Sequence, residues 1–366
     1  MKTWRGVLCV SILVSALGAL ALAQRAATPA PAAATGLRIY VSDETGNSVA
    51  VIDPVAGKVI EQLPVGKRPR GIKVSPVGGQ LIVALSGSPL APPGTDQKSL
   101  PPPDRAADGI GVVDLATHKV LRIVKSGDDP ESFDVSRDGK TVYVSNEDSG
   151  ELTVLDLSSG RIVTRVKVGE EPEGVKLRPD GRVVYVTSEG DGEVTAVDTT
   201  THAIVGHMKT DARPRGIAFT ADSALAFVTC ENGRLMADGS DVEGIVNVLD
   251  ARLHKVLGAI AIPKPAGAPT AARPMGFVMS ADGKTAYVTL GRAKAVAVID
   301  VAARKLTRTF DNVGDRPWGI GISPDGTKLY TANGPSGDVS IVDIATGKVD
   351  RKIPTGKSPW GIAVKP

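Results

Sequence analysis

One pattern recurs seven times along the chain and constrains its fold more than any other feature. An apolar strand is followed by a turn, a second strand that ends in Asp, another turn, a third strand and a Pro-x-Gly element (Pro-x-Ser at 130–132) that opens a fourth. The Asp falls at Asp53, Asp114, Asp156, Asp198, Asp250, Asp300 and Asp343, and the Pro falls at Pro69, Pro130, Pro172, Pro214, Pro274, Pro317 and Pro359. A third anchor gives the same count at Tyr40, Ile82, Tyr143, Tyr185, Phe227, Tyr287 and Tyr330. Repeats of about 42 residues with four strands each are typical of propeller blades.

The side-chain pattern within each repeat alternates with a period of two, as in TVYVS at 141–145 and ELTVLD at 151–156. This period indicates strands rather than helices. Asp-Gly pairs at 138–139 and 325–326 suit tight hairpins, and we expect the seven strand-ending Asp residues to cap the next turn. The sequence therefore predicts an all-β fold, a seven-bladed β-propeller with four antiparallel strands per blade.

The two ends of the repeat region complement each other. The region begins with the second strand of a blade at 37–42 and finishes with a first strand at 360–364. We therefore expect the C-terminal strand to join the N-terminal blade and close the ring, which leaves only short sheet edges. Residues 37–366 are predicted to form this single domain.

The first 36 residues do not share the repeat. Basic Lys2 and Arg5 precede an apolar run at 6–22 and small residues up to Ala23, which predicts a signal peptide over 1–23. Residues 24–36 are rich in Ala and Pro and are expected to form a flexible leader. We expect no membrane span after cleavage and a periplasmic or secreted protein.

Charge and cysteine content exclude some classes of function. Cleavage after Ala23 would remove two of the 43 basic residues and none of the 40 acidic ones, leaving a nearly neutral chain. Nucleic-acid binding needs a strong basic excess, so no nucleic-acid partner is expected. Only Cys230 remains beyond the apolar run, which precludes an intrachain disulfide. We expect it to be a buried structural thiol.

Three inserts interrupt the repeat, at 86–108, 231–243 and 263–272. In an up-and-down propeller these connections emerge on one face, so this face is the candidate surface for a protein partner or small-molecule ligand. The alternative is that insertions are merely tolerated there.

The residue after each repeat Pro is expected at the mouth of the central channel on that face. These candidate binding residues are, around the ring, Trp360, Arg70, Glu131, Glu173, Arg215, Met275 and Trp318. An apolar arc thus faces an acidic pair flanked by two arginines, which suits an amphipathic ligand. Alternatively, Arg70 with Glu131 and Arg215 with Glu173 form ion pairs between neighbouring blades, while the tryptophans plug the channel.

A second ring on this face consists of Glu44, Glu147, Glu189 and Glu231. We expect solvated loop charges there rather than a metal site, because one carboxylate per blade does not converge. His118, His202 and His254 share one turn on the opposite face, and no haem, phosphate-loop or nucleophile-elbow motif occurs. The sequence predicts no catalytic residue, no metal and no cofactor.

Several phrases resemble the bacterial YVTN-type β-propeller repeat family over residues 37–366. They are YVSN at 143–146, YVTS at 185–188, VID at 51–53, SPDG at 323–326 and IATGK at 344–348. RPRG at 68–71, DPE at 129–131, EPEG at 171–174, DARPR at 211–215 and PWGIAVKP at 359–366 resemble the subgroup associated with quinoprotein alcohol catabolism, dependent on pyrroloquinoline quinone. The three inserts depart from that subgroup. The resemblance implies an exported partner of an oxidation pathway and carries over no catalytic residue.

These observations favour a non-catalytic propeller scaffold that binds a partner, in a periplasmic quinoprotein-linked oxidation pathway. A rival is a lactonase-like or lyase-like enzyme that uses Glu131 or Glu173 with Arg70 or Arg215. A third alternative is a cell-surface interaction module.

Overall fold

The computed structural model describes Met1 and residues 36–90, 99–235, 242–268 and 270–366. The chain divides into two units, residues 1–34 and 35–366. The predicted signal peptide and nearly all of the predicted leader therefore lie outside the described residues. The described part contains no helix long and apolar enough to cross a membrane.

The second unit is built from seven four-stranded sheets, numbered here as blades 1 to 7. Blade 1 contains β28 (Pro359–Lys365), β1 (Arg38–Asp43), β2 (Ser48–Asp53) and β3 (Lys58–Pro64). Blade 2 contains β4 (Pro69–Val74), β5 (Gln80–Leu85), β6 (Gly109–Asp114) and β7 (Lys119–Val124). Blade 3 contains β8 (Pro130–Val135), β9 (Thr141–Asn146), β10 (Glu151–Asp156) and β11 (Arg161–Lys167).

The remaining blades follow the same order from inner to outer strand. Blade 4 contains β12 (Pro172–Leu177), β13 (Val183–Ser188), β14 (Glu193–Asp198) and β15 (Ile204–Lys209). Blade 5 contains β16 (Ala212–Phe219), β17 (Leu225–Leu235), β18 (Val242–Asp250) and β19 (Lys255–Ile262). Blade 6 contains β20 (Pro274–Met279), β21 (Thr285–Leu290), β22 (Ala295–Asp300) and β23 (Lys305–Phe310). Blade 7 contains β24 (Pro317–Ile322), β25 (Lys328–Asn333), β26 (Asp338–Asp343) and β27 (Val349–Pro354).

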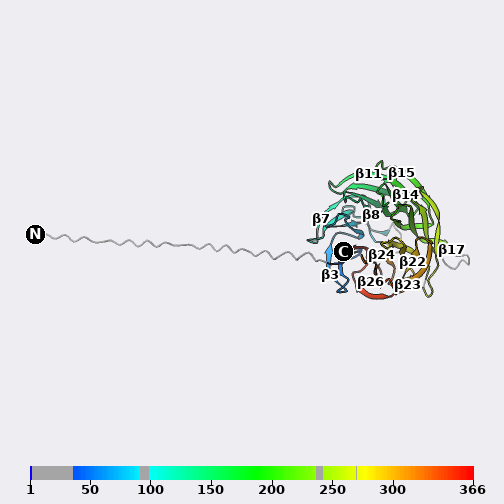
Figure 1. Ribbon diagram of the computed structural model, residues 1–366. Coiled ribbons are helices and arrows are strands. Elements are labelled where there is room, and N and C mark those ends of the chain that lie inside the picture. The colour runs from blue at the N-terminus through cyan, green and yellow to red at the C-terminus, as the bar shows by residue number, and fades with distance from the viewer. Residues whose placement is uncertain (2–35, 91–98, 236–241, 269) are drawn as a thin grey trace. The chain divides into compact units, whose positions relative to one another are not determined.

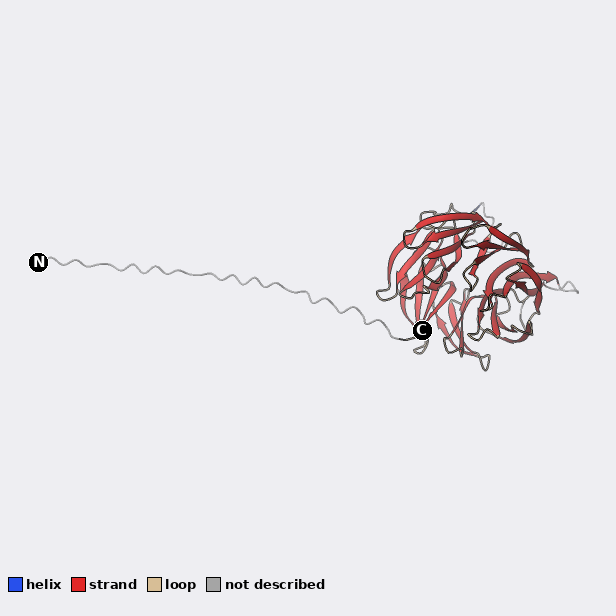
Figure 2. Cartoon of the chain, turned by 45° about the horizontal axis from the view of Figure 1, so that its top comes forward, coloured by secondary structure: helices blue, strands red, loops and turns tan. Residues whose placement is uncertain are grey.

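This arrangement confirms the predicted seven-bladed all-β propeller. Strands and loops make up the described residues in Figure 2. Outer strands β3, β7, β11, β15 and β23 lie at the periphery in Figure 1, whereas β8 and β24 lie nearer the middle. The apolar core lies between neighbouring blades: Tyr40 of blade 1, for example, packs in one cluster with Ile72 and Leu81 of blade 2. Burying each such side chain stabilises the fold by about 1.5–3 kcal/mol.

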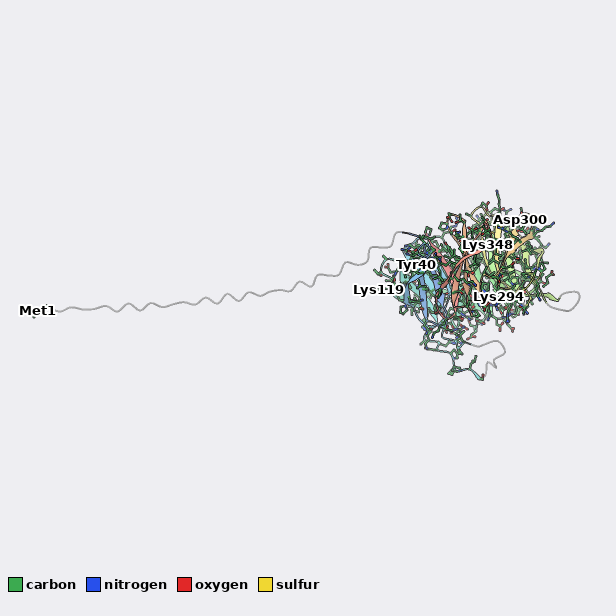
Figure 3. The ribbon with its side chains drawn as sticks, turned by 90° about the horizontal axis from the view of Figure 1, so that it is seen from below. Met1, Tyr40, Lys119, Lys294, Asp300 and Lys348 are labelled. Carbon is green, nitrogen blue, oxygen red and sulfur yellow. The ribbon has the colours of Figure 1, made fainter. Side chains whose placement is uncertain are left out.

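The strand-ending Asp residues cap turns in all seven blades, as predicted. Oδ1 of Asp53 accepts hydrogen bonds from the amides of Val55 and Ala56, at 3.0 and 2.8 Å. The same contact recurs at Asp114, Asp156, Asp198, Asp250, Asp300 and Asp343. Lys294 and Asp300, labelled in Figure 3, bracket β22 and mark its two ends. The capping turns lie at the Asp end, opposite the channel mouth described below.

Ring closure is also confirmed. β1 pairs with β28, so that Ile39 lies opposite Val364, and with β2 on its other side. The carboxylate of Asp43 stabilises the pairing of β1 with β28, because it accepts hydrogen bonds from the amides of Lys357 and Ser358 at 3.0 and 2.8 Å.

Candidate functional site

A cavity of about 1640 Å³ opens at one end of the central channel, and all seven blades contribute to its wall. Six of the seven predicted mouth residues line it: Arg70, Glu131, Glu173, Arg215, Trp318 and Trp360. Met275 is not part of the wall; its side chain is 2% exposed and packs toward Gly291. Because the thioether is apolar and Gly291 leaves room for it, Met275 turns into the protein instead of the cavity.

The predicted inserts meet this wall to different extents. Ser88, Leu90 and Leu100 of insert 86–108 line the cavity, and residues 91–98 lie outside the described residues. Insert 231–243 was expected to be a loop, but β17 and β18 extend into it as a hairpin, which places Asn232 on the wall. Insert 263–272 is a loop, with residue 269 not described, and it ends beside Arg273 of the wall.

The glycine of the Pro-x-Gly element, present in six of the seven blades, lies against the mouth residue of the neighbouring blade; Ser132 takes its place in blade 3. A Cβ on Gly174 would lie 1.9 Å from the carbonyl oxygen of Arg215, the mouth residue of the next blade. Gly216, Gly276, Gly319 and Gly361 meet the equivalent carbonyls of Met275, Trp318, Trp360 and Arg70. At these glycine positions only a residue without a side chain permits so close an approach. The repeated glycine therefore brings the inner strands together around the channel.

A buried hydroxyl on the second strand of five blades holds the same carbonyl. The Thr187 hydroxyl donates to the carbonyl of Arg215 at 2.9 Å and accepts from the amide of Gly174 at 2.7 Å. The equivalent donors in the other blades are Ser42, Ser145, Thr229 and Thr289. The Ser or Thr in the YVS and YVT phrases thus links neighbouring blades through a hydrogen bond, and we call this contact the hydroxyl latch.

The residue before each repeat Pro also lines the cavity, a feature that the sequence analysis missed. In six blades this residue is charged and has a left-handed backbone, with φ between 38° and 57°. These residues are Arg68, Asp129, Glu171, Arg213, Arg273 and Arg316. Such a backbone is unfavourable for residues other than Gly. Their repeated charge before Pro was the signal that could have revealed them.

Arg70 is the centre of a buried ion-pair cluster. Its guanidinium lies 3.2 Å from Glu44, 3.5 Å from Asp129 and 3.3 Å from Glu147, and it contacts Glu131 directly. Burial raises the pKa of Glu44 and Asp129, but the positive charges of Arg70 and Arg68 outweigh it, so both pKa values are lowered. These two carboxylates are therefore ionised.

Arg215 forms a second cluster with three carboxylates. It contacts Glu173, lies 2.5 Å from Glu189 and lies 2.7 Å from Glu231. Arg213 contacts Glu189 and lies 3.4 Å from Glu231. The structure thus contains both ion pairs between neighbouring blades that the sequence suggested, Arg70 with Glu131 and Arg215 with Glu173.

Three of the four carboxylates of the second ring are buried in these clusters, so the expectation of solvated loop charges was wrong for them, whereas Glu147 is half-buried. Glu44 and Glu189 are at most 8% exposed because the next blade brings arginines to them, and Glu231, which is equally buried, pairs with arginines of its own blade. Burial and the charges of Asp129 and Glu173 raise the pKa of Glu147 to about 7, although Arg70 opposes the shift. Burial and a hydrogen bond to Glu173 raise the pKa of Glu189. The carboxyl pair Glu173 and Glu189 therefore shares a proton near neutral pH.

The two tryptophans lie together on the opposite part of the wall. The ring centroids of Trp318 and Trp360 are 5.7 Å apart, with an angle of 23° between planes. The guanidinium carbons of Arg215 and Arg316 lie 4.9 and 4.7 Å from the Trp318 ring centroid. Both indoles are half-buried, so part of each ring borders the cavity.

Metal and thiol chemistry find no support in the described residues. No group of three or more His, Cys, Asp or Glu side chains there has the arrangement to hold a metal ion. Cys230 is buried as expected, and burial raises the pKa of its thiol to about 12, which keeps it protonated. Among the described wall residues there is no histidine; His254 lies beyond a strand-ending Asp and contacts the Tyr185 hydroxyl at 2.8 Å.

Comparison with known proteins identifies the family. The model of the YNCE-like beta-propeller family matches residues 94–179 and 177–365, so the chain belongs to that family. Antigen Lp49 of Leptospira interrogans is 30% identical over 109 residues, which cover 30% of this chain and 23% of the antigen. The chain thus spans about a quarter of that curated relative.

Solved structures share the fold at low sequence identity. A protein from Lactobacillus plantarum superimposes with a TM-score of 0.71 at 18% identity, covering 90% of this chain and 99% of its own. A candidate 6-phosphogluconolactonase from Bacteroides fragilis gives a TM-score of 0.69 at 18% identity, covering 90% and 98%. These likenesses concern the propeller fold alone.

Proposed function

We propose that this protein is an exported, non-catalytic propeller that binds a protein or small molecule at its channel mouth. The observation that carries the proposal is the mutual neutralisation of the mouth: Arg70 and Arg215 are surrounded by carboxylates from several blades. Paired charges held by a rigid ring offer shape and orientation to a ligand rather than a free nucleophile. The described wall also lacks histidine and cysteine.

The proposal includes a cellular setting. We infer that the protein is exported and serves a quinoprotein-linked oxidation pathway in the periplasm. The support is the signal-like N-terminus and the resemblance of RPRG at 68–71 and PWGIAVKP at 359–366 to the quinoprotein-associated subgroup. Localisation of the chain by cell fractionation tests the first part directly. Fractionation with the envelope would instead favour a cell-surface interaction module.

Copurification from a periplasmic extract tests the binding role. Leu90 borders the cavity and is 42% exposed, whereas Leu253 lies in a turn beyond a strand-ending Asp and is 70% exposed. Leu90→Asp should therefore abolish capture of the partner, while the matched Leu253→Asp should retain it. Recovery of no dehydrogenase or transporter component with the wild type would contradict the quinoprotein setting. Equal capture by both variants would contradict binding at the mouth.

A second candidate function is favoured by the pKa of Glu147, about 7, beside Arg70. A carboxyl group that titrates near neutral pH in a cavity can act as a general acid or base, as a lactonase-like or lyase-like enzyme requires. If this function is correct, the wild type turns over a member of a lactone panel, and Glu131→Gln, Glu173→Gln or Glu147→Gln abolishes it. A wild type that is inactive across the panel would remove this candidate.

A further inference from the structure

The charges of the cavity wall are unevenly distributed between its two sides. Ten acidic residues line the cavity, and all of them come from blades 1, 3, 4 and 5. The described wall contributed by residues 273–360 contains three arginines, one lysine and two tryptophans but no acidic residue. We call Arg273, Arg292, Arg316, Trp318 and Trp360 the Trp-Arg sector. Its electrostatic complement is an anion.

Arg316 provides the most specific observation in this sector. Its Nε is buried and has no hydrogen-bond partner among the described residues. Burial lowers the pKa of Arg316, and the positive charges of Arg215 and Arg292 lower it further, although Glu231 and Glu44 act in the opposite direction. A buried donor without an acceptor costs stability, and a carboxylate bound at the same guanidinium would offset that cost.

The tryptophan pair defines the shape of the ligand beside that charge. Trp318 and Trp360 stack at 5.7 Å and both border the cavity. Because stacked rings cover one face of each other, the apolar surface that remains for another planar ring is the part of each indole that borders the cavity. The guanidinium of Arg316 lies over the same Trp318 ring, so the charged group and the flat surface are adjacent.

We propose that the Trp-Arg sector binds a small planar aromatic carboxylate, with its ring against the indoles and its carboxylate at Arg316. This inference rests on the proposed function and names the class of ligand. The acidic remainder of the wall disfavours a nucleic-acid strand, because a phosphate chain that crossed the mouth would meet its carboxylates. A single carboxylate can stay within the positive sector.

Isothermal titration of the full chain with naphthoate tests the proposal. We expect saturable one-site binding that is at least about tenfold tighter than for naphthalenemethanol, which lacks the charge, or cyclohexanecarboxylate, which lacks the flat ring. Arg316→Gln and Trp360→Leu should each weaken binding by about tenfold or more. Arg308→Gln is the matched control, because Arg308 stacks on Phe310 at 4.6 Å outside the cavity and should keep wild-type affinity.

The outcomes separate this inference from the function on which it rests. Equal binding of naphthoate and its neutral analogue, or equal effects of Arg316→Gln and Arg308→Gln, would overturn the inference. Displacement of naphthoate by a short single-stranded oligonucleotide would also overturn it. A wild type that captures its periplasmic partner but does not bind naphthoate would refute the ligand class alone. Thermal unfolding verifies that each variant is folded, and Trp360→Leu decides the test if Arg316→Gln does not fold.

Discussion

Arg70 and Arg215 each contact a glutamate of a neighbouring blade, but in opposite directions around the ring. Arg70 of blade 2 contacts Glu131 of blade 3, whereas Arg215 of blade 5 contacts Glu173 of blade 4. The two acids lie in adjacent blades, so each arginine turns toward the acidic pair from its own side. A buried guanidinium is costly unless carboxylates surround it, and removing one partner leaves the other charge uncompensated. Single substitutions here should therefore have effects that depend on which carboxylate is protonated.

The shared proton of Glu173 and Glu189 gives the first prediction. The raised pKa of Glu189 means that the folded state holds a proton that the unfolded chain releases above a pH of about 4.3. The wild type therefore loses stability through this group as the pH rises above that value. The glutamine of Glu189→Gln does not titrate. The melting temperature of this variant minus that of the wild type should therefore increase from pH 4 to pH 8. A difference that does not change with pH would contradict the shared proton.

Glu231 should behave in the opposite way. Burial raises its pKa, but the charge of Arg215 and its hydrogen bond outweigh burial, so the pKa is lowered. Its stabilising contribution is present above the unfolded pKa and is lost as the pH falls through the folded one. Glu231→Gln should therefore unfold at a lower temperature than the wild type at pH 7, and the gap should narrow toward acid pH. Thermal unfolding monitored by circular dichroism measures both variants.

At the scale of one strand, the Pro-x-Gly element links sequence to the cavity. Its glycine lets a neighbouring carbonyl approach, and in six of the seven blades the residue after the Pro projects to the mouth. Gly174→Ala would place a Cβ 1.9 Å from the Arg215 carbonyl oxygen and should destabilise the protein by about 3 kcal/mol. The control is Gly334→Ala, whose Cβ would meet its nearest atom at 3.6 Å. Denaturant unfolding that gives equal losses would refute the close-approach role.

The buried hydroxyl latch is testable on its own. Thr187→Val keeps the shape of the side chain but leaves the Arg215 carbonyl and the Gly174 amide without this partner. The loss should be about 2 kcal/mol in the free energy of unfolding. Thr200 is exposed in a turn, so Thr200→Val should cost less than about 0.5 kcal/mol. If both variants unfold at the same denaturant concentration, the latch contributes nothing beyond an ordinary surface hydroxyl.

The repeat predicted the elements better than the directions of their side chains. Count, strand order, turn caps and closure all follow from the spacing of Asp, Pro and aromatic residues, because each blade repeats one local pattern. The inward turn of Met275, the left-handed charged residues before Pro and the burial of Glu189 depend on contacts from neighbouring blades. The sequence pattern of one blade does not indicate which side chains of the neighbouring blade will contact it. Six of the seven residues predicted at the mouth therefore line the cavity, whereas the burial of Glu44, Glu189 and Glu231 was not predicted.

At the scale of the whole molecule, the ring depends on its last strand. β28 supplies the inner strand of blade 1, packs Ala363 beside Tyr40, and contributes Trp360 to the cavity. Without it, β1 would be an open edge and the apolar faces of blades 1, 2 and 7 would lose part of their cover. Asp43 would also lose the two amides that it binds.

Ending the chain after Gly356 should therefore abolish cooperative unfolding of the propeller and make it sensitive to protease. The matched control keeps every strand but moves the chain ends. In a circular permutant that begins at Lys357, a short linker joins Pro366 to Leu37, near the paired residues Arg38 and Lys365. This permutant should unfold cooperatively with a melting temperature close to the wild type, because its closed ring is the same. A truncated chain as stable as the permutant would show that closure by β28 is dispensable, since the two proteins differ chiefly in that strand.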